Sequence, residues 1–135
     1  MEKMSETKVE WHPYPKEDLP MIGFYFLTIR GHHGNFVDIF RISPEKEWMR
    51  KFVVAWAELP NPYDKRRKKD SMVNWNPYPD EIPSKDGYYL TTLIYKRKKY
   101  IETRSWFLER REFDEEDDEN IIAWAELPEP YKENL

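Results

Sequence analysis

Ala123-Trp124-Ala125-Glu126-Leu127-Pro128-Glu129-Pro130-Tyr131 nearly repeats Ala55-Trp56-Ala57-Glu58-Leu59-Pro60-Asn61-Pro62-Tyr63, with eight of nine residues identical. The opening of the chain repeats as well, since residues 73–79 match residues 9–15 at all but two positions. A match of this length within one chain is very rarely accidental. We therefore predict two tandem copies of one module, with residues 1–63 as the first repeat, residues 64–72 as a basic linker and residues 73–135 as the second repeat.

Composition predicts that each copy is built from β-strands. Aromatic and β-branched residues dominate several short runs that are bounded by proline, glycine or charged residues. The candidate strands are residues 9–11, 24–30, 36–42 and 52–56 in the first copy and residues 73–75, 88–95, 100–108 and 121–124 in the second. The predicted fold class is mainly β, with a small α+β fold as the alternative. We expect two tandem antiparallel β-meander repeats, each of about 60 residues.

Local signals add a helix and a structural motif to this scheme. Ser43 can cap a helix and Pro44 suits its first position, so one short helix through about Arg50 is expected in the first repeat. Gly87 follows Asp86 and is expected to have a positive φ at a turn. The residues expected to build the scaffold, in the core or rim or at turns, are Trp11, Trp56, Trp75, Trp124, Gly23 and Gly87.

Composition also excludes several classes of protein. The chain has no cysteine, so it forms neither a disulfide nor a thiolate metal site. His32 and His33 are adjacent, and neighbours on a strand point to opposite faces, so we predict no metal site. The start is polar, and no run approaches the ~20 apolar residues that a membrane span needs. We expect a soluble cytoplasmic protein with no membrane partner and no cofactor.

No catalytic motif can be assembled from the sequence. It has no Gly-x-Ser-x-Gly, and its four glycines form no phosphate-binding loop. Glu58 and Glu126 are acids repeated close to a tryptophan, and a hydrolase that uses them is the least favoured alternative. The basic cluster at residues 65–69 could hold phosphates, but the chain is acidic overall, so we interpret the cluster as a linker.

Aromatic and basic residues that lie close together in the second copy are typical of a ligand site. An aromatic ring can stack on a base while nearby arginines hold phosphates. The predicted ligand-binding residues are Arg104, Trp106, Arg110, Arg111, Tyr63 and Tyr131. We expect a pocket between the repeats or across an oligomer interface.

The spacing of the repeated residues resembles a short domain of unknown function that is widespread in bacteriophage and prophage genomes. The pattern reads Trp11, Pro20, Gly23-Phe24-Tyr25 and Trp56-Ala57-Glu58-Leu59-Pro60-Asn61-Pro62, then Trp75, Pro83, Gly87-Tyr88-Tyr89 and Trp124-Ala125-Glu126-Leu127-Pro128-Glu129-Pro130. Many members have a single copy, and Met-Pro often follows the last tryptophan where this chain has Ala-Glu. The resemblance implies a phage accessory protein that counters a host defence, and it brings no catalytic residues.

These observations favour a non-enzymatic phage accessory binding protein that acts in the host cytoplasm during infection. One hypothesis is that it sequesters a nucleotide-derived defence signal in an aromatic and basic pocket. The other is that it blocks a host defence protein through its acidic loop, residues 114–119, and its proline-rich segments. We do not expect nucleic acid as a partner, and we expect the two repeats to pack together or the chain to form a homo-oligomer.

Overall fold

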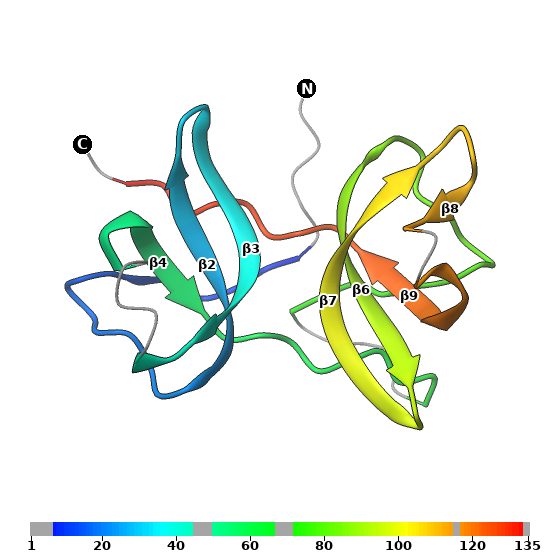
Figure 1. Ribbon diagram of the computed structural model, residues 1–135, viewed down its shortest axis with the longest axis horizontal. Helices are drawn as coiled ribbons and strands as arrows, with labels where there is room; N and C mark the ends of the chain where they lie inside the picture. The colour runs from blue at the N-terminus through cyan, green and yellow to red at the C-terminus, as the bar shows by residue number, and fades with distance from the viewer. Residues whose placement is uncertain (1–6, 45–49, 67–71, 115–116, 134–135) are drawn as a thin grey trace. The chain divides into compact units, whose positions relative to one another are not determined.

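The computed structural model describes residues 7–44, 50–66, 72–114 and 117–133, and it confirms a mainly β fold with two antiparallel sheets (Figure 1). The first sheet contains β1 (His12–Pro13), β2 (Gly23–Gly31), β3 (Gly34–Ile42) and β4 (Val53–Ala57), in the order β1-β4-β2-β3. This order departs from a simple meander, because β4 lies between β1 and β2. Since a proline cannot donate to a central ladder, the Pro13 strand is at the sheet edge.

The second sheet repeats this order and adds one strand. It contains β5 (Asn76–Pro77), β6 (Gly87–Tyr95), β7 (Lys98–Phe107), β8 (Glu112–Phe113) and β9 (Ile121–Ala125), in the order β5-β9-β6-β7-β8. The long hairpins and the closing strands lie where the sequence predicted them. The predicted first strands, residues 9–11 and 73–75, are displaced to His12–Pro13 and Asn76–Pro77, because these residues form the ladders with β4 and β9.

The chain forms two compact units, and each unit combines segments of both sequence copies. The β1–β4 unit contains the described residues from 9 to 59 and from 128 onward. The β5–β9 unit contains the described residues up to 8 and from 60 to 127. The proline-rich segment that closes each copy in sequence is thus part of the unit built by the other copy. The boundaries of the two compact units therefore differ from the boundaries of the two sequence copies.

Each sheet is covered on one face by its own apolar cluster. In the β1–β4 unit the buried members are Leu27, Ile29, Ile42 and Val53. In the β5–β9 unit they are Tyr89, Leu93, Trp106, Phe113 and Ile121. Trp106 and Phe113 are the largest fully buried side chains of the second cluster, and their ring centroids are 4.8 Å apart.

Gly23 and Gly87 are needed for close packing rather than for a turn conformation. A Cβ on Gly23 would lie 3.1 Å from the Tyr25 ring, and one on Gly87 would lie 3.3 Å from the Tyr89 ring. The prediction of a positive φ at Gly87 was wrong, because among the described glycines only Gly34 has one, at 119°. A bare glycine lets the tyrosine two residues later fold over the backbone.

These tyrosines in turn contact the tryptophans of the closing strands. Tyr25 meets the Trp56 ring edge-on at 5.8 Å, and Tyr89 meets the Trp124 ring at 5.4 Å. Both tryptophans are half-buried, at the rim of their clusters. The Gly-x-Tyr and Trp parts of the repeated pattern are therefore one packing arrangement.

Two-residue turns close both long hairpins. His32–His33 connects β2 to β3, and Lys96–Arg97 connects β6 to β7. Lys96 and Arg97 have φ values of 50° and 67°, the left-handed conformation of a type I′ hairpin turn. The β6–β7 turn therefore presents two basic side chains from a backbone that the turn geometry fixes.

A β-bulge interrupts the ladder at the same place in both sheets. The pairing of β2 with β4 shifts register between Thr28 and Ile29. The pairing of β6 with β9 shifts between Thr92 and Leu93. Both threonines are fully buried. A bulge frees backbone and side-chain groups from regular pairing, so each sheet has one buried hydroxyl at an irregular position.

Helical structure is limited to single turns in the described residues. The predicted helix from Ser43 falls largely on residues 45–49, outside the described residues, and residues 50–52 form a 3-10 turn. A second 3-10 turn spans Asp118–Asn120. No helix among the described residues has the length and apolar character needed to cross a membrane.

The position of Trp106 gives a stability prediction. Trp106→Ala should lower the free energy of unfolding by about 3–5 kcal/mol. The Trp106 side chain is 1 % exposed, so its removal leaves a cavity in the apolar cluster of the β5–β9 unit. Trp124→Ala, the matched rim variant, should cost less. Trp106→Phe should also cost less than Trp106→Ala, since Trp106 Nε1 has no hydrogen-bond partner among the described residues. Denaturant melts would measure all three, and an equal loss for Trp106→Ala and Trp124→Ala would contradict the assignment.

Candidate functional site

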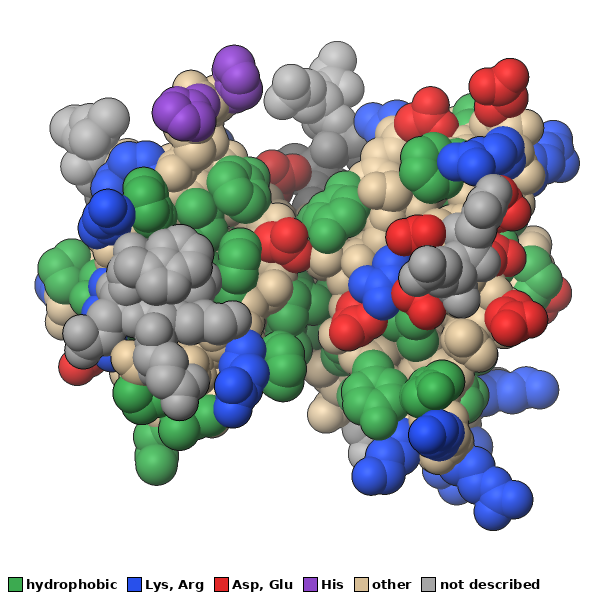
Figure 2. Space-filling model, viewed as in Figure 1, with side chains coloured by type: hydrophobic (Ala, Val, Ile, Leu, Met, Phe, Trp, Pro, Cys, Tyr) green, Lys and Arg blue, Asp and Glu red, His purple; other side chains and the backbone are tan. Residues whose placement is uncertain are grey.

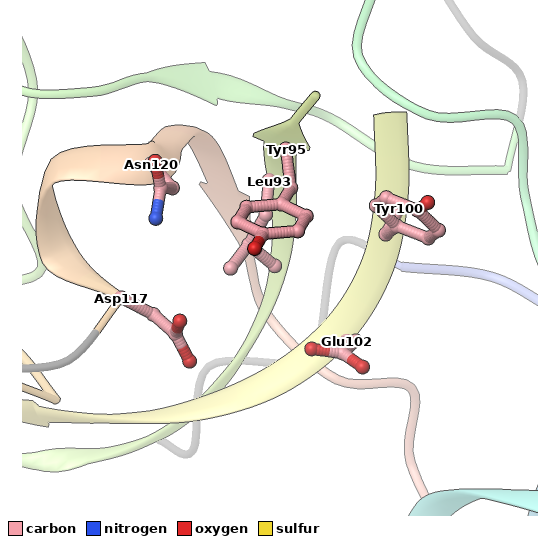
Figure 3. A pocket seen from close by; sticks show the side chains of 6 residues that line it. All are labelled: Leu93, Tyr95, Tyr100, Glu102, Asp117 and Asn120. Atoms are coloured by element: carbon pink, nitrogen blue, oxygen red, sulfur yellow. The ribbon is translucent and has the colours of Figure 1, made fainter. Parts of the chain in front are cut away.

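A pocket of about 280 Å³ lies at the β6–β7 hairpin of the β5–β9 unit (Figure 3). It is lined by Leu93, Tyr95, Tyr100, Glu102, Asp117 and Asn120. Leu93 and Tyr95 come from β6, and Tyr100 and Glu102 from β7. Asp117 and Asn120 come from the turn that precedes β9. Aromatic and carboxylate groups therefore share one small pocket.

The pocket exists because the hairpin extends beyond its neighbouring strand. The ladder between β6 and β9 ends at Leu93, which pairs with Ile121. Residues after Leu93 on β6 pair only with β7. Tyr95 is 56 % exposed and Tyr100 is 45 % exposed, since no strand covers them on that side. Both rings are available to a flat ligand.

Carboxylates form the second part of the pocket, and Arg104 joins them. Arg104 Nε donates to Asp117 Oδ2 at 2.9 Å, and Arg104 Nη2 donates to a Glu102 carboxylate oxygen. Burial opposes the charge of the guanidinium, but the hydrogen bond to Asp117 and the charge of Glu102 leave the pKa of Arg104 raised. Because one guanidinium is shared by two carboxylates, the group of Arg104, Glu102 and Asp117 has a net negative charge. Each carboxylate also keeps free acceptor positions.

Basic side chains adjoin the aromatic wall on the other side. Lys96, Arg97, Lys98 and Lys99 are all exposed at the end of the hairpin. Lys96 Nζ lies 5.4 Å from the centre of the Tyr95 ring. Figure 2 shows basic side chains gathered at this end of the β6–β7 hairpin, beside hydrophobic ones, with acidic side chains farther along the same face. The site thus changes from basic to aromatic to acidic.

Trp106 does not face this pocket. Its ring is 1 % exposed and packs in the β5–β9 core against Phe113. A ring covered in this way offers no face to a base in this conformation. Its neighbour Arg104 lies beside the pocket, but its guanidinium is used to hold Glu102 and Asp117.

The other predicted site residues are distributed over both units. Arg110 lies over the Phe107 ring at 4.4 Å, and Arg111 has a φ of 53° in the turn that leads to β8. Tyr63 belongs to the β5–β9 unit and Tyr131 to the β1–β4 unit, both half-buried. The backbone carbonyl of Tyr63 accepts a hydrogen bond from Lys99 Nζ at 2.8 Å. None of the six predicted ligand-binding residues lines the pocket at the β6–β7 hairpin.

The acidic run is partly structural rather than a solvated loop. Asp118 accepts hydrogen bonds from the Tyr78 hydroxyl at 2.6 Å and from the Phe113 N–H at 2.8 Å. Burial, followed by the hydrogen bond and charge of Asp118, raises the pKa of Tyr78 well above its usual range. These contacts anchor the turn, and the same turn places Asp117 in the pocket.

The remaining candidates are distributed over both units. Glu58 is exposed after β4, whereas Glu126 is half-buried after β9 in the other unit. His32 and His33 are exposed at the β2–β3 turn. No cluster of three or more potential ligand side chains among the described residues could hold a metal ion.

The pocket residues carried a sequence signal that the prediction missed. Tyr100, Glu102 and Arg104 alternate along one strand, and a period of two places them on one face. Tyr95 precedes four basic residues in a row. The contribution of Asp117 had no such signal, because it depends on the fold of the segment before β9.

Comparison of the chain with protein-family models, with curated proteins and with solved structures found no match.

Proposed function

We propose that the chain is a non-enzymatic, phage-type accessory protein that sequesters a nucleotide-derived defence signal. The tandem repeat and the resemblance of its motifs to a phage-encoded domain support the phage assignment, with the host cytoplasm as the place of action. The pocket at the β6–β7 hairpin supports the ligand class. Its arrangement of acidic, aromatic and basic groups is the observation that carries the proposal.

Each part of a nucleotide has a complementary group at this site. The exposed Tyr95 and Tyr100 rings offer faces on which a base can stack. Glu102 and Asp117 can accept hydrogen bonds from the amino group of a base or from ribose hydroxyls. Lys96 to Lys99 supply positive charge for phosphates outside the pocket. A volume of about 280 Å³ suits the base and sugar rather than a whole signal molecule.

The competing hypothesis of a host-protein inhibitor has less support. It needs the acidic loop and the proline-rich segments on the surface for a partner. Asp117 and Asp118 are already bonded within the β5–β9 unit. The proline-rich segments are held by the two sheets. We therefore prefer the pocket to these segments as the working surface.

Tyr100→Ala should weaken binding of the signal by about 1–3 kcal/mol, the usual contribution of one aromatic ring that stacks on a base. Phe36→Ala is the matched control, because Phe36 precedes Tyr100 by 64 residues, the offset between the copies, and is also 45 % exposed. Calorimetry against a panel of cyclic and ADP-ribose-like nucleotides would measure both. If no nucleotide binds, or if both variants lose affinity equally, the proposed pocket is wrong.

Removal of charge from the hairpin should reduce the salt dependence of binding. Arg97→Ser with Lys98→Ser should weaken binding at low salt and flatten the dependence of affinity on ionic strength, because phosphate contacts are screened by salt. Lys65→Ser is the control, since it removes one exposed positive charge elsewhere in the same unit. Titrations at several salt concentrations give the slopes, and identical slopes in all variants would exclude phosphate binding at the hairpin.

A sequestering protein should return its ligand intact. After incubation of a bound nucleotide with substoichiometric protein, heat denaturation should release all of it unchanged, since binding breaks no bond. Chromatography of the supernatant would measure recovery over time. Progressive loss to a new product would replace sequestration by catalysis.

A further inference from the structure

Residues 128–133 lie against the sheet of the β1–β4 unit without forming a strand. Trp11 Nε1 donates to the backbone carbonyl of Glu129 at 3.1 Å. The Tyr131 N–H donates to Thr28 Oγ1 at 3.0 Å, and Thr28 is fully buried at the β-bulge. The side chains of Trp11, just before β1, and of Thr28 on β2 thus bind two backbone groups of this segment.

The β5–β9 unit binds residues 60–63 in the same way. Trp75 Nε1 donates to the backbone carbonyl of Asn61 at 3.3 Å. The Tyr63 N–H donates to Thr92 Oγ1 at 3.0 Å, again at a bulge. The same residue types therefore bind the same two positions of a Leu-Pro-x-Pro-Tyr segment in both units. Position x is Asn61 in one and Glu129 in the other, so the shared contacts do not depend on its side chain.

Proline suits this mode of binding. Pro60 and Pro128 are buried in their units, and a second proline follows each of them two residues later. Proline fixes φ near −65° and has no N–H, so the segment is extended before it binds and has fewer donors to satisfy. A groove with aromatic residues that receives such a segment is a recurring mode of peptide recognition.

The β1–β4 unit adds a preference for an acidic residue. Glu133 accepts a hydrogen bond from Arg30 Nη2 at 2.7 Å and one from Asn35 Nδ2 at 3.4 Å. A hollow of about 450 Å³ is lined by Asn35 of β3 and by residues 129–133 of the segment itself. The Arg30 side chain is 55 % exposed and that of Glu133 is 30 % exposed, and ion pairs near the surface stabilise a protein only weakly. The contacts of Glu133 therefore favour a segment with an acidic residue at this position, but they are weak enough for the segment to be displaced.

We propose that the β1–β4 unit is a recognition site for protein segments of the type Pro-x-Pro-Tyr-x-Glu, and that residues 128–133 of this chain occupy it until a partner protein's segment displaces them. The recognised chemistry is an extended, proline-rich strand with an acidic residue two positions after tyrosine. This site uses none of the pocket residues at the β6–β7 hairpin. The proposal is therefore independent of the proposed nucleotide binding, and either one can fail without the other.

The internal segment sets the threshold for a competitor. A segment on the same chain acts at an effective concentration of about millimolar, so a short peptide must exceed that to compete. Weakening the internal segment lowers the threshold. The full-length double variant Tyr131→Pro/Glu133→Ala removes the N–H that Thr28 accepts and the carboxylate that Arg30 binds.

The test is the binding of a fluorescent Leu-Pro-Glu-Pro-Tyr-Lys-Glu peptide, measured by anisotropy. The double variant should bind it at least about tenfold more tightly than the unmodified chain does, since the internal competitor is weakened. Adding Thr28→Val should reduce this affinity about tenfold, because the peptide N–H loses its buried acceptor. Thr92→Val, the equivalent change in the other unit, should have no effect. A peptide with N-methyl tyrosine should bind as poorly as the Thr28→Val chain.

A second measurement uses the unmodified chain in case the double variant does not fold. Isotope-labelled protein is titrated with unlabelled peptide to about 5 mM, above the effective concentration of the internal segment. Amide signals of Tyr131 and Glu133 should move to random-coil positions, while the Trp11 indole signal stays in place because the peptide carbonyl replaces that of Glu129. Unmoved signals, or binding that is insensitive to Thr28→Val, would overturn the proposal. A concentration-dependent dimer that the peptide does not dissociate would assign the site to a second copy and overturn it too.

Discussion

A buried threonine hydroxyl at a β-bulge is the contact on which each unit depends. Thr28 and Thr92 each accept the N–H of a tyrosine from the other sequence copy. Leaving such a buried donor without a partner costs about 1–3 kcal/mol, a large part of the stability of a domain this small. The bulge positions the threonine hydroxyl, and the hydrogen bond to that hydroxyl positions the proline-rich segment in the unit.

The strands could be predicted from sequence because their signal is local. Aromatic and β-branched runs form the long hairpins, and Trp-rich motifs mark the closing strands. The path of the proline-rich segments could not be predicted. Trp11 with Thr28 and Trp75 with Thr92 offer each segment the same contacts, so the residues alone do not distinguish a segment that folds back on its own copy from one that crosses over.

The candidate site was only partly predictable for a different reason. Trp106 and Tyr100 are both aromatic residues on β7 beside charged neighbours, yet one is buried and the other exposed. Their difference arises because Phe113 of β8 covers Trp106, whereas β9 ends before it reaches the hairpin tip. Strand lengths and added edges decide exposure, and a window of sequence does not contain that information.

The two units have the same framework and different surfaces. At the offset of 64, Tyr95 corresponds to Gly31 and Tyr100 to Phe36. Glu102 corresponds to Asp38, and Asp117 lies in the stretch where the second copy is four residues longer. The β1–β4 unit therefore lacks the tyrosine pair and its basic extension. The packing motif is therefore the same in both units, whereas the side chains at the hairpins differ.

Because each unit includes a segment of the other copy, the protein cannot be divided into two folded halves at the middle of its chain. A single backbone cut between residues 63 and 73 would leave one fragment with the segment that fills the β5–β9 unit and another with the segment that fills the β1–β4 unit. The two pieces would stay associated and restore each other on mixing, as in fragment complementation. Each fragment thus carries a segment that the unit formed by the other fragment needs.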